Sequence, residues 1–144
     1  MKKASFAPRR GNERAQKILL RAFFFASLLA LPAVVAPRVA AEKLSLFFGL
    51  AERPQTPLLL YMMAGGSAVY VGQAVLMWLM SCDVARYRPL INVVAWGYVV
   101  CGPLFAWIHS QAGTPQGWLL VDVVGCLAFG MALVWACHTK RFAA

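Results

Sequence analysis

Asp122 is the residue in this sequence whose type and position most suggest chemistry. It lies about five residues inside the apolar run 118–137, or roughly 7 Å below the end of that run at the rise of an α-helix. A carboxyl group at this depth in an apolar environment is costly and requires a partner or water. If the apolar runs cross a membrane, several polar residues lie at the same outer end: His109, Tyr61, Gln111 and Gln116.

Two interpretations of Asp122 follow from these positions. In the structural one, Pro103 frees the carbonyl group of Val99 within the preceding run, and a protonated Asp122 donates a hydrogen bond to a group of this kind. In the functional one, Asp122 forms the polar lining of a pocket open to the outer side, together with His109, Tyr61, Gln111 and Gln116. A pocket carboxylate with a histidine nearby suits proton transfer or cation binding. The sequence leaves both interpretations open.

Other chemistry has little support in the sequence. The four cysteines, Cys82, Cys101, Cys126 and Cys137, form no CxxC pair and have no spacing with histidine that is typical of a metal site. Histidine clusters and acidic pairs are missing too, which argues against redox chemistry by this chain alone. We therefore predict no catalytic residue, no metal and no cofactor.

The elements that must position Asp122 are four apolar helices. The stretches 54–82 and 89–121 contain no aspartate, glutamate, lysine or arginine, and 61% of the 144 residues are hydrophobic while 13% are charged. Charged residues make up about a quarter of an ordinary soluble protein. About 20 apolar residues of helix cross a bilayer, and the runs 18–36, 58–80, 90–108 and 118–137 meet that length. The sequence predicts an all-α integral membrane protein, an antiparallel four-helix bundle over 18–137.

The segments outside the four runs are polar or mixed. Residues 1–17 form a basic arm and residues 138–144 a tail, while 37–57 is too short to span and too apolar for a free loop, so we expect it to lie in the interface. Arg21 lies one turn inside the first run, from where it can reach the interface. Pro89 suits the first turn of the third helix.

The basic residues predict an orientation. With both termini cytoplasmic, eleven lysines and arginines lie on the inner side, and only Arg38, Lys43 and Arg53 lie on the outer side. This is the asymmetry that the positive-inside rule describes, and it places the chain in the inner membrane as a multi-pass protein. Small residues at 39–41 also resemble a signal-peptide cleavage site. Cleavage there would leave three helices in the same orientation.

Small residues recur four apart on three of the runs: Ala64, Ala68 and Gly72; Gly102 and Ala106; Ala128, Ala132 and Ala136. Such stripes allow helix backbones to approach closely in lipid. They favour a compact bundle, and the alternative is the face of a homodimer.

A loose family resemblance adds to this interpretation. The segments Leu46 to Leu50, Pro57 to Leu60 and Asp83 to Leu90 look like those of the small four-helix bacterial membrane proteins of the DoxX-like and BphX-like group. The resemblance covers residues 18–137. It implies an antiparallel four-helix bundle with an uncleaved first helix, and it carries over no catalytic residue.

Two classes of function remain. The first is a non-enzymatic membrane protein, either an accessory subunit or a small-molecule-binding bundle. The alternative is a membrane enzyme or a proton-coupled transport subunit that uses Asp122 and His109. The expected partners are the lipid bilayer, anionic lipid at the basic arm, and a second copy or a membrane partner protein. The net charge of +9 is spread over the ends of the apolar runs rather than over one face, so we expect no nucleic-acid partner.

Overall fold

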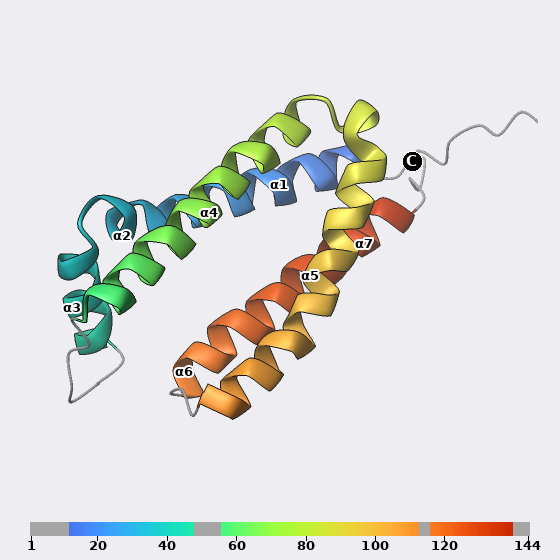
Figure 1. The fold of residues 1–144 in the computed structure, drawn as a ribbon. Coiled ribbons are helices and arrows are strands. Elements are labelled where there is room, and N and C mark those ends of the chain that lie inside the picture. Colours follow the sequence, from blue (N-terminus) through green and yellow to red (C-terminus); the bar gives the residue numbers. More distant parts are fainter. Residues whose placement is uncertain (1–11, 48–55, 113–115, 140–144) are drawn as a thin grey trace, which may run out of the picture.

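The computed structural model describes residues 12–47, 56–112 and 116–139, except for the side chains at 112, 116 and 118. Within these ranges the chain is helical and contains no strand (Figure 1). The elements in order are α1 (Glu13–Ser27), η1 (Leu28–Ala30), α2 (Leu31–Val35), α3 (Pro37–Phe47), α4 (Pro57–Cys82), α5 (Val84–Ala112), α6 (Gln116–Leu119), η2 (Leu120–Val124) and α7 (Gly125–His138).

Four of the helical stretches are long and apolar enough to cross a membrane. They are Glu13–Val35, Pro57–Cys82, Val84–Gln111 and Leu120–His138. The first is built from α1, η1 and α2, with a short 3₁₀ turn just before Pro32, and the last from η2 and α7. This confirms the prediction of an all-helical chain with four candidate membrane-spanning helices.

The helix boundaries differ from the predicted ones at two places that affect charged residues. α1 begins at Glu13 rather than at residue 18, because the Asn12 side chain caps it by accepting a hydrogen bond from the Ala15 N–H at 3.2 Å. Arg21 is therefore more than two turns inside this helix, and its guanidinium group lies over the Trp78 ring, 5.2 Å from the centroid. Arg21 still lies one turn inside the apolar run 18–36, so its reach to the interface stays a prediction.

The second difference concerns Pro89, which lies inside α5 rather than in its first turn. α5 begins at Val84, directly after Asp83, whose Oδ1 accepts the Arg86 N–H at 3.1 Å. This aspartate cap starts the helix five residues before the proline. By contrast, Pro57 does open α4, directly behind Thr56. The segment expected at the interface contains α3, and its residues 48–55 lie outside the described part.

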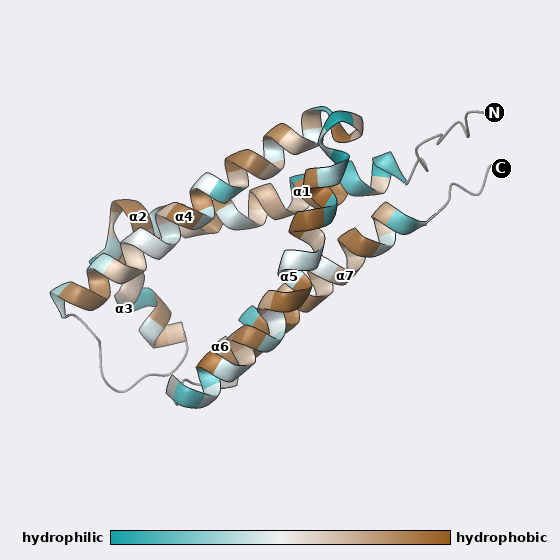
Figure 2. Ribbon diagram, turned by 45° about the vertical axis from the view of Figure 1, so that its right-hand side comes forward, coloured by the Kyte–Doolittle hydropathy of each residue, from teal (hydrophilic) through white to brown (hydrophobic). Residues whose placement is uncertain are grey.

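The helices pack as two pairs that meet at one end and diverge towards the other (Figures 1 and 2). α1 lies along α4 in one pair, and α5 lies along α7 in the other. We call the region where the pairs meet the joined end and the opposite region the open end. The start of α1 lies beside the end of α4 at the joined end, where Glu13, Lys17 and Asp83 line one groove.

The joined end contains the hydrophobic core. Its buried members come from α1, α4, α5 and α7: Leu20, Met77, Met80, Val84, Ile91, Ala95 and Leu133. Two hydrogen bonds fasten the start of α1 to the end of α7, since the Asn12 N–H and the Gln16 side-chain amide both donate to the Ala136 carbonyl, at 3.1 and 3.0 Å. Ala136 is itself buried. These bonds hold the start of the first span against the end of the last span.

Close approach of α5 and α7 depends on Gly130. A Cβ at this position would lie 2.8 Å from the Val99 backbone nitrogen and 3.0 Å from the Ala95 carbonyl oxygen. Gly102 is also tightly packed, against the Leu127 side chain, as the predicted stripe on the third run requires. Gly72, in the stripe on the second run, makes no such approach, because nothing lies within 4 Å of a Cβ at this position. Sequence spacing alone did not identify Gly130.

Candidate functional site

Asp122 lies in a local distortion of the last span. The five residues of η2 form a π-helical turn between α6 and α7, with Asp122 at its centre. A π-turn contains more residues than an α-turn, so it changes the direction in which side chains before and after it project, and such turns are frequent at functional sites. No pattern in the sequence indicates this turn.

The carboxylate of Asp122 is paired with His109. Its Oδ2 lies 3.1 Å from Nε2 of His109, across the short connection between α5 and α6. The His109 side chain is 7% exposed and that of Asp122 is 35% exposed, so the histidine is enclosed while the carboxylate is partly open. His109 also lies in the last turn of α5, where the helix dipole favours a positive charge. The predicted neighbours Asp122 and His109 are therefore together.

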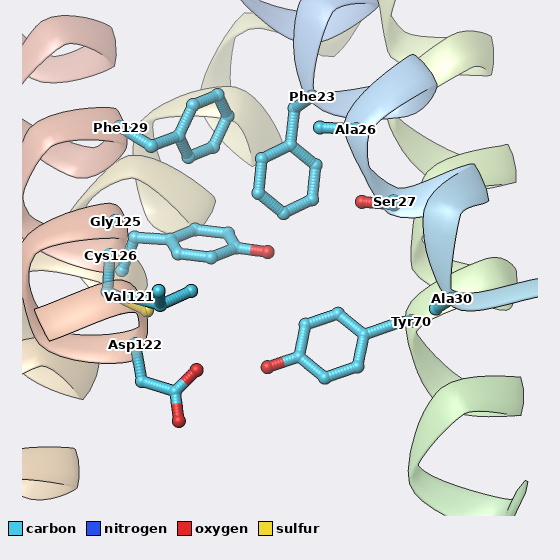
Figure 3. Close-up of a pocket in the computed structure, with 11 residues that line it drawn as sticks. Phe23, Ala26, Ser27, Ala30, Tyr70, Val121, Asp122, Gly125, Cys126 and Phe129 are labelled. Atoms are coloured by element: carbon cyan, nitrogen blue, oxygen red, sulfur yellow. The ribbon is translucent and has the colours of Figure 1, made fainter. Parts of the chain in front are cut away.

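Asp122 also lines a cavity of about 450 Å³ between the two helix pairs. Figure 3 shows the carboxylate on one side and the Tyr70 hydroxyl on the other, pointing toward each other across the cavity. The Ser27 hydroxyl enters from α1. All other lining side chains are apolar, aromatic or sulfur-containing: Phe23, Ala26, Ala30, Tyr98, Val121, Gly125, Cys126 and Phe129. The size and the mostly apolar lining are typical of a small-molecule site.

Three aromatic rings, one from each of α1, α5 and α7, close the cavity towards the joined end. The centroid of Phe23 lies 5.1 Å from that of Tyr98 and 4.4 Å from that of Phe129, and Tyr98 and Phe129 are 4.9 Å apart. The hydroxyl of Tyr98 is buried and has no hydrogen-bond partner in the structure. An unpartnered buried hydroxyl is costly, which marks this position as unusual.

A second cavity, of about 570 Å³, lies on the α4 and α5 side of the same gap. It shares Tyr70, Tyr98 and Cys126 with the first cavity, and its remaining lining is Gly66, Val69, Gln73, Val93, Val94, Gly97, Cys101 and Phe105. The first cavity is bordered by α1 and α7, and the second by α4 and α5. The two cavities therefore lie next to each other, and the two tyrosines belong to the lining of both.

Two of the remaining predicted pocket residues, Tyr61 and Gln111, are not part of this arrangement. Tyr61 is 76% exposed on α4. Tyr70, about two and a half turns further along the same helix, lines the cavity where Tyr61 was predicted. Gln111 is exposed, with its amide 3.5 Å from the Ser110 hydroxyl. The side chain of Gln116 lies outside the described residues. The structural interpretation named a backbone carbonyl as the partner of Asp122, and the partner that the structure shows is His109.

Sequence reasoning missed Tyr70 and Tyr98, although a signal was present. Both lie near the middle of a candidate span, Tyr70 in Pro57–Cys82 and Tyr98 in Val84–Gln111. Interfacial tyrosines lie near helix ends, so a tyrosine in mid-span carries a hydroxyl that needs another explanation. Apart from the segments that the structure leaves undescribed, no group of three His, Cys, Asp or Glu side chains could hold a metal ion.

No protein-family model matches this chain, and no curated protein and no solved structure matches it either.

Proposed function

We propose that this chain is a multi-pass protein of the inner membrane that binds a lipophilic small molecule between its two helix pairs, without catalysing a reaction on it. The observation that carries the proposal is the cavity bordered by Phe23, Tyr98 and Phe129, with Asp122 and Tyr70 as its polar end. Ligand sites are concave and mostly apolar, with a few convergent polar groups. The similarity to the DoxX-like group stays a prediction.

The exposed surface supports a lipid environment. Large apolar side chains are exposed along all four candidate spans, including Leu29 at 81%, Val35 at 77% and Val69 at 70%. Soluble proteins rarely expose contiguous apolar patches of more than a few hundred Å². In a bilayer the same side chains face lipid tails at no cost.

The distribution of charge supports cytoplasmic termini. The joined end holds Arg14, Lys17 and Arg86, while Arg38 and Lys43 of α3 lie toward the open end. Positive residues are enriched on the cytoplasmic side of bacterial membrane proteins. In the proposed arrangement the four spans alternate in direction as an antiparallel bundle, the joined end faces the cytoplasm, and α3 lies in the outer interface.

Cysteine labelling tests this topology. In a variant without the four native cysteines, single cysteines replace the exposed residues Arg86, Lys43 or Gln111. A membrane-impermeant maleimide should label position 86 only from the cytoplasmic side, and positions 43 and 111 only from outside. Labelling of positions 86 and 111 from the same side contradicts the four-span arrangement.

Photolabelling tests the binding function. A neutral alkyl benzophenone, added to the protein in lipid nanodiscs, should label the cavity segments 23–30 and 121–129. The variant Ala26→Trp fills the cavity and should abolish this labelling, while Ala22→Trp, four residues earlier in α1 and outside the cavity lining, should not. Even labelling of all lipid-facing surfaces, insensitive to Ala26→Trp, contradicts a specific site.

The second candidate function is proton-coupled transport, favoured by the His109–Asp122 pair at 3.1 Å. A paired histidine and carboxylate can exchange protons near neutral pH. In proteoliposomes containing a pH-sensitive dye, this function predicts proton flux that Asp122→Asn abolishes and Asp83→Asn preserves. We expect no flux that depends on Asp122, because the binding proposal requires none.

A further inference from the structure

The geometry points to a lipophilic cation as the guest of the cavity bordered by α1 and α7. This inference rests on the proposed binding function and names the class of ligand. It follows from three features of the cavity: the sign of its charge, the aromatic rings that line it, and its position within the candidate spans.

Among the described residues that line the cavity, Asp122 is the only ionisable acid or base apart from the tyrosines and Cys126. No lysine or arginine is among the described residues that line either cavity. Arg21 on α1 lies over the Trp78 ring and does not line them. An anion would enter this space without a compensating positive group from the lining, whereas a cation would find a carboxylate.

Pairing with His109 does not remove this preference. The pair is negative when the imidazole is neutral, and it is neutral overall when the imidazole is charged. Only Oδ2 of Asp122 is engaged by His109, and the Asp122 side chain, which is 35% exposed, lines the cavity and faces Tyr70 across it (Figure 3). The histidine is enclosed, at 7% exposure, so the guest meets the carboxylate rather than the imidazole.

The aromatic lining favours the same sign of charge. Phe23, Tyr98 and Phe129 contact one another with centroid separations of 4.4 to 5.1 Å. Ring faces are negative and attract cations, and the attraction is larger where water is excluded. A guest with an apolar body and a delocalised positive charge would use the rings and the carboxylate together.

The position of the cavity explains why the guest must also be lipophilic. Its lining residues lie within the candidate spans, from residue 23 to 30 in the first and from 121 to 129 in the last. In the proposed arrangement a guest reaches this level through the lipid, between α1 and α7. A strongly hydrated cation would lose its water on this path, and a cation shielded by apolar groups would not.

Two ions of the same shape and opposite charge test the inference. Tetraphenylphosphonium and tetraphenylborate are presented to the full-length protein in a non-ionic detergent, and binding is measured by equilibrium dialysis. Partition into the micelle is subtracted with the Ala26→Trp variant, in which the cavity is filled. We expect the phosphonium ion to bind at least about tenfold more tightly than the borate ion, which corresponds to about 1.4 kcal/mol.

The matched variants are Asp122→Asn and Asp83→Asn. Asp122→Asn removes the cavity carboxylate and should weaken phosphonium binding about tenfold or more, the scale of a hydrogen bond or contact with a charged group. Asp83→Asn removes an equal charge from the exposed cap of α5 and should leave binding unchanged. If Asp122→Asn does not fold, Asp122→Glu keeps the charge and should retain the preference for the phosphonium ion.

The outcomes separate the two proposals. Equal binding of the two ions, or a preference that survives Asp122→Asn, overturns the cation inference while the binding function stands, provided that Ala26→Trp removes the binding. If Ala26→Trp changes the binding of neither ion, the cavity is not a site for either, and the cation inference falls. The neutral photoprobe then decides the binding function separately.

Discussion

The joined end and the open end of this molecule use the same kinds of residue for different purposes. At the joined end, seven apolar side chains from four helices are buried together, and the Ala136 carbonyl accepts two hydrogen bonds from the start of α1. At the open end, the gap between the helix pairs holds a mostly apolar cavity with Asp122, His109 and Tyr70 near it. The first arrangement fastens the pairs together, and the second leaves space between them. The comparison predicts that stability depends on the joined end and binding on the open end.

The largest effect on stability should come from the joined end. Leu133→Ala removes a fully buried side chain from the core, and we expect it to lower the free energy of unfolding by about 2–4 kcal/mol. Leu29→Ala, at an 81% exposed position beside the open end, is the matched control and should change it by less than about 0.5 kcal/mol. Denaturant unfolding in detergent measures both. Equal losses of unfolding free energy at the two positions would contradict the prediction that stability depends on the joined end.

The next largest loss of stability should come from a substitution at the contact between α5 and α7. Gly130→Ala places a Cβ against backbone atoms of Val99 and Ala95, which cannot rotate away, so α5 and α7 must separate. We expect a loss of about 1–3 kcal/mol in the same measurement. Gly72→Ala meets no atom within 4 Å and should leave stability unchanged or raise it slightly, because alanine favours the helix. A destabilising Gly72→Ala would show that α4 has a packing partner at this face.

The ion pair at the open end should contribute less. A double-mutant cycle of His109→Ala and Asp122→Ala isolates its coupling energy, which we expect to be about 0.6–2 kcal/mol, the range found for polar contacts between membrane helices. A cycle of Ser110→Ala with Asp122→Ala is the control, since the Ser110 hydroxyl bonds to the Trp107 carbonyl on its own helix. A coupling near zero for the first cycle would mean that the pair adds nothing to the connection between α5 and the last span.

The positions of the long helices could be predicted from the sequence. Which residues of different helices contact each other could be predicted less well. Hydropathy depends on each residue alone, so the four long apolar helices could be located from it. The His109–Asp122 neighbourhood could also be predicted, because a short connection between two spans brings their adjoining ends together. Which residues face each other deeper in the structure depends on helix rotation. The π-turn around Asp122 and the close approach at Gly130 set that rotation, and neither has a sequence pattern in this chain.

This limit explains why Tyr70 lines the cavity in place of the predicted Tyr61. Both are polar aromatic residues on α4, and depth alone favoured Tyr61, which lies near the open end of that helix. In the structure Tyr61 is exposed, whereas Tyr70 faces Asp122 from α4 across the cavity. The pairs diverge, so the face of α4 that meets the cavity is decided by the joined end, several turns away. A residue-by-residue pattern does not contain that information.

The smallest expected effect concerns Tyr98, and its sign is informative. Its buried hydroxyl has no hydrogen-bond partner, so Tyr98→Phe keeps the edge-to-face contacts of the ring with Phe23 and Phe129 and removes only an unsatisfied group. We expect stability in the absence of a guest to stay unchanged or rise by up to about 1 kcal/mol, with the exposed Tyr61→Phe as the control that changes nothing. A loss of more than 1 kcal/mol would show that the hydroxyl bonds to a group in the folded protein. A gain would mean that the open end keeps a polar group at a cost to stability, as proteins do at positions retained for binding.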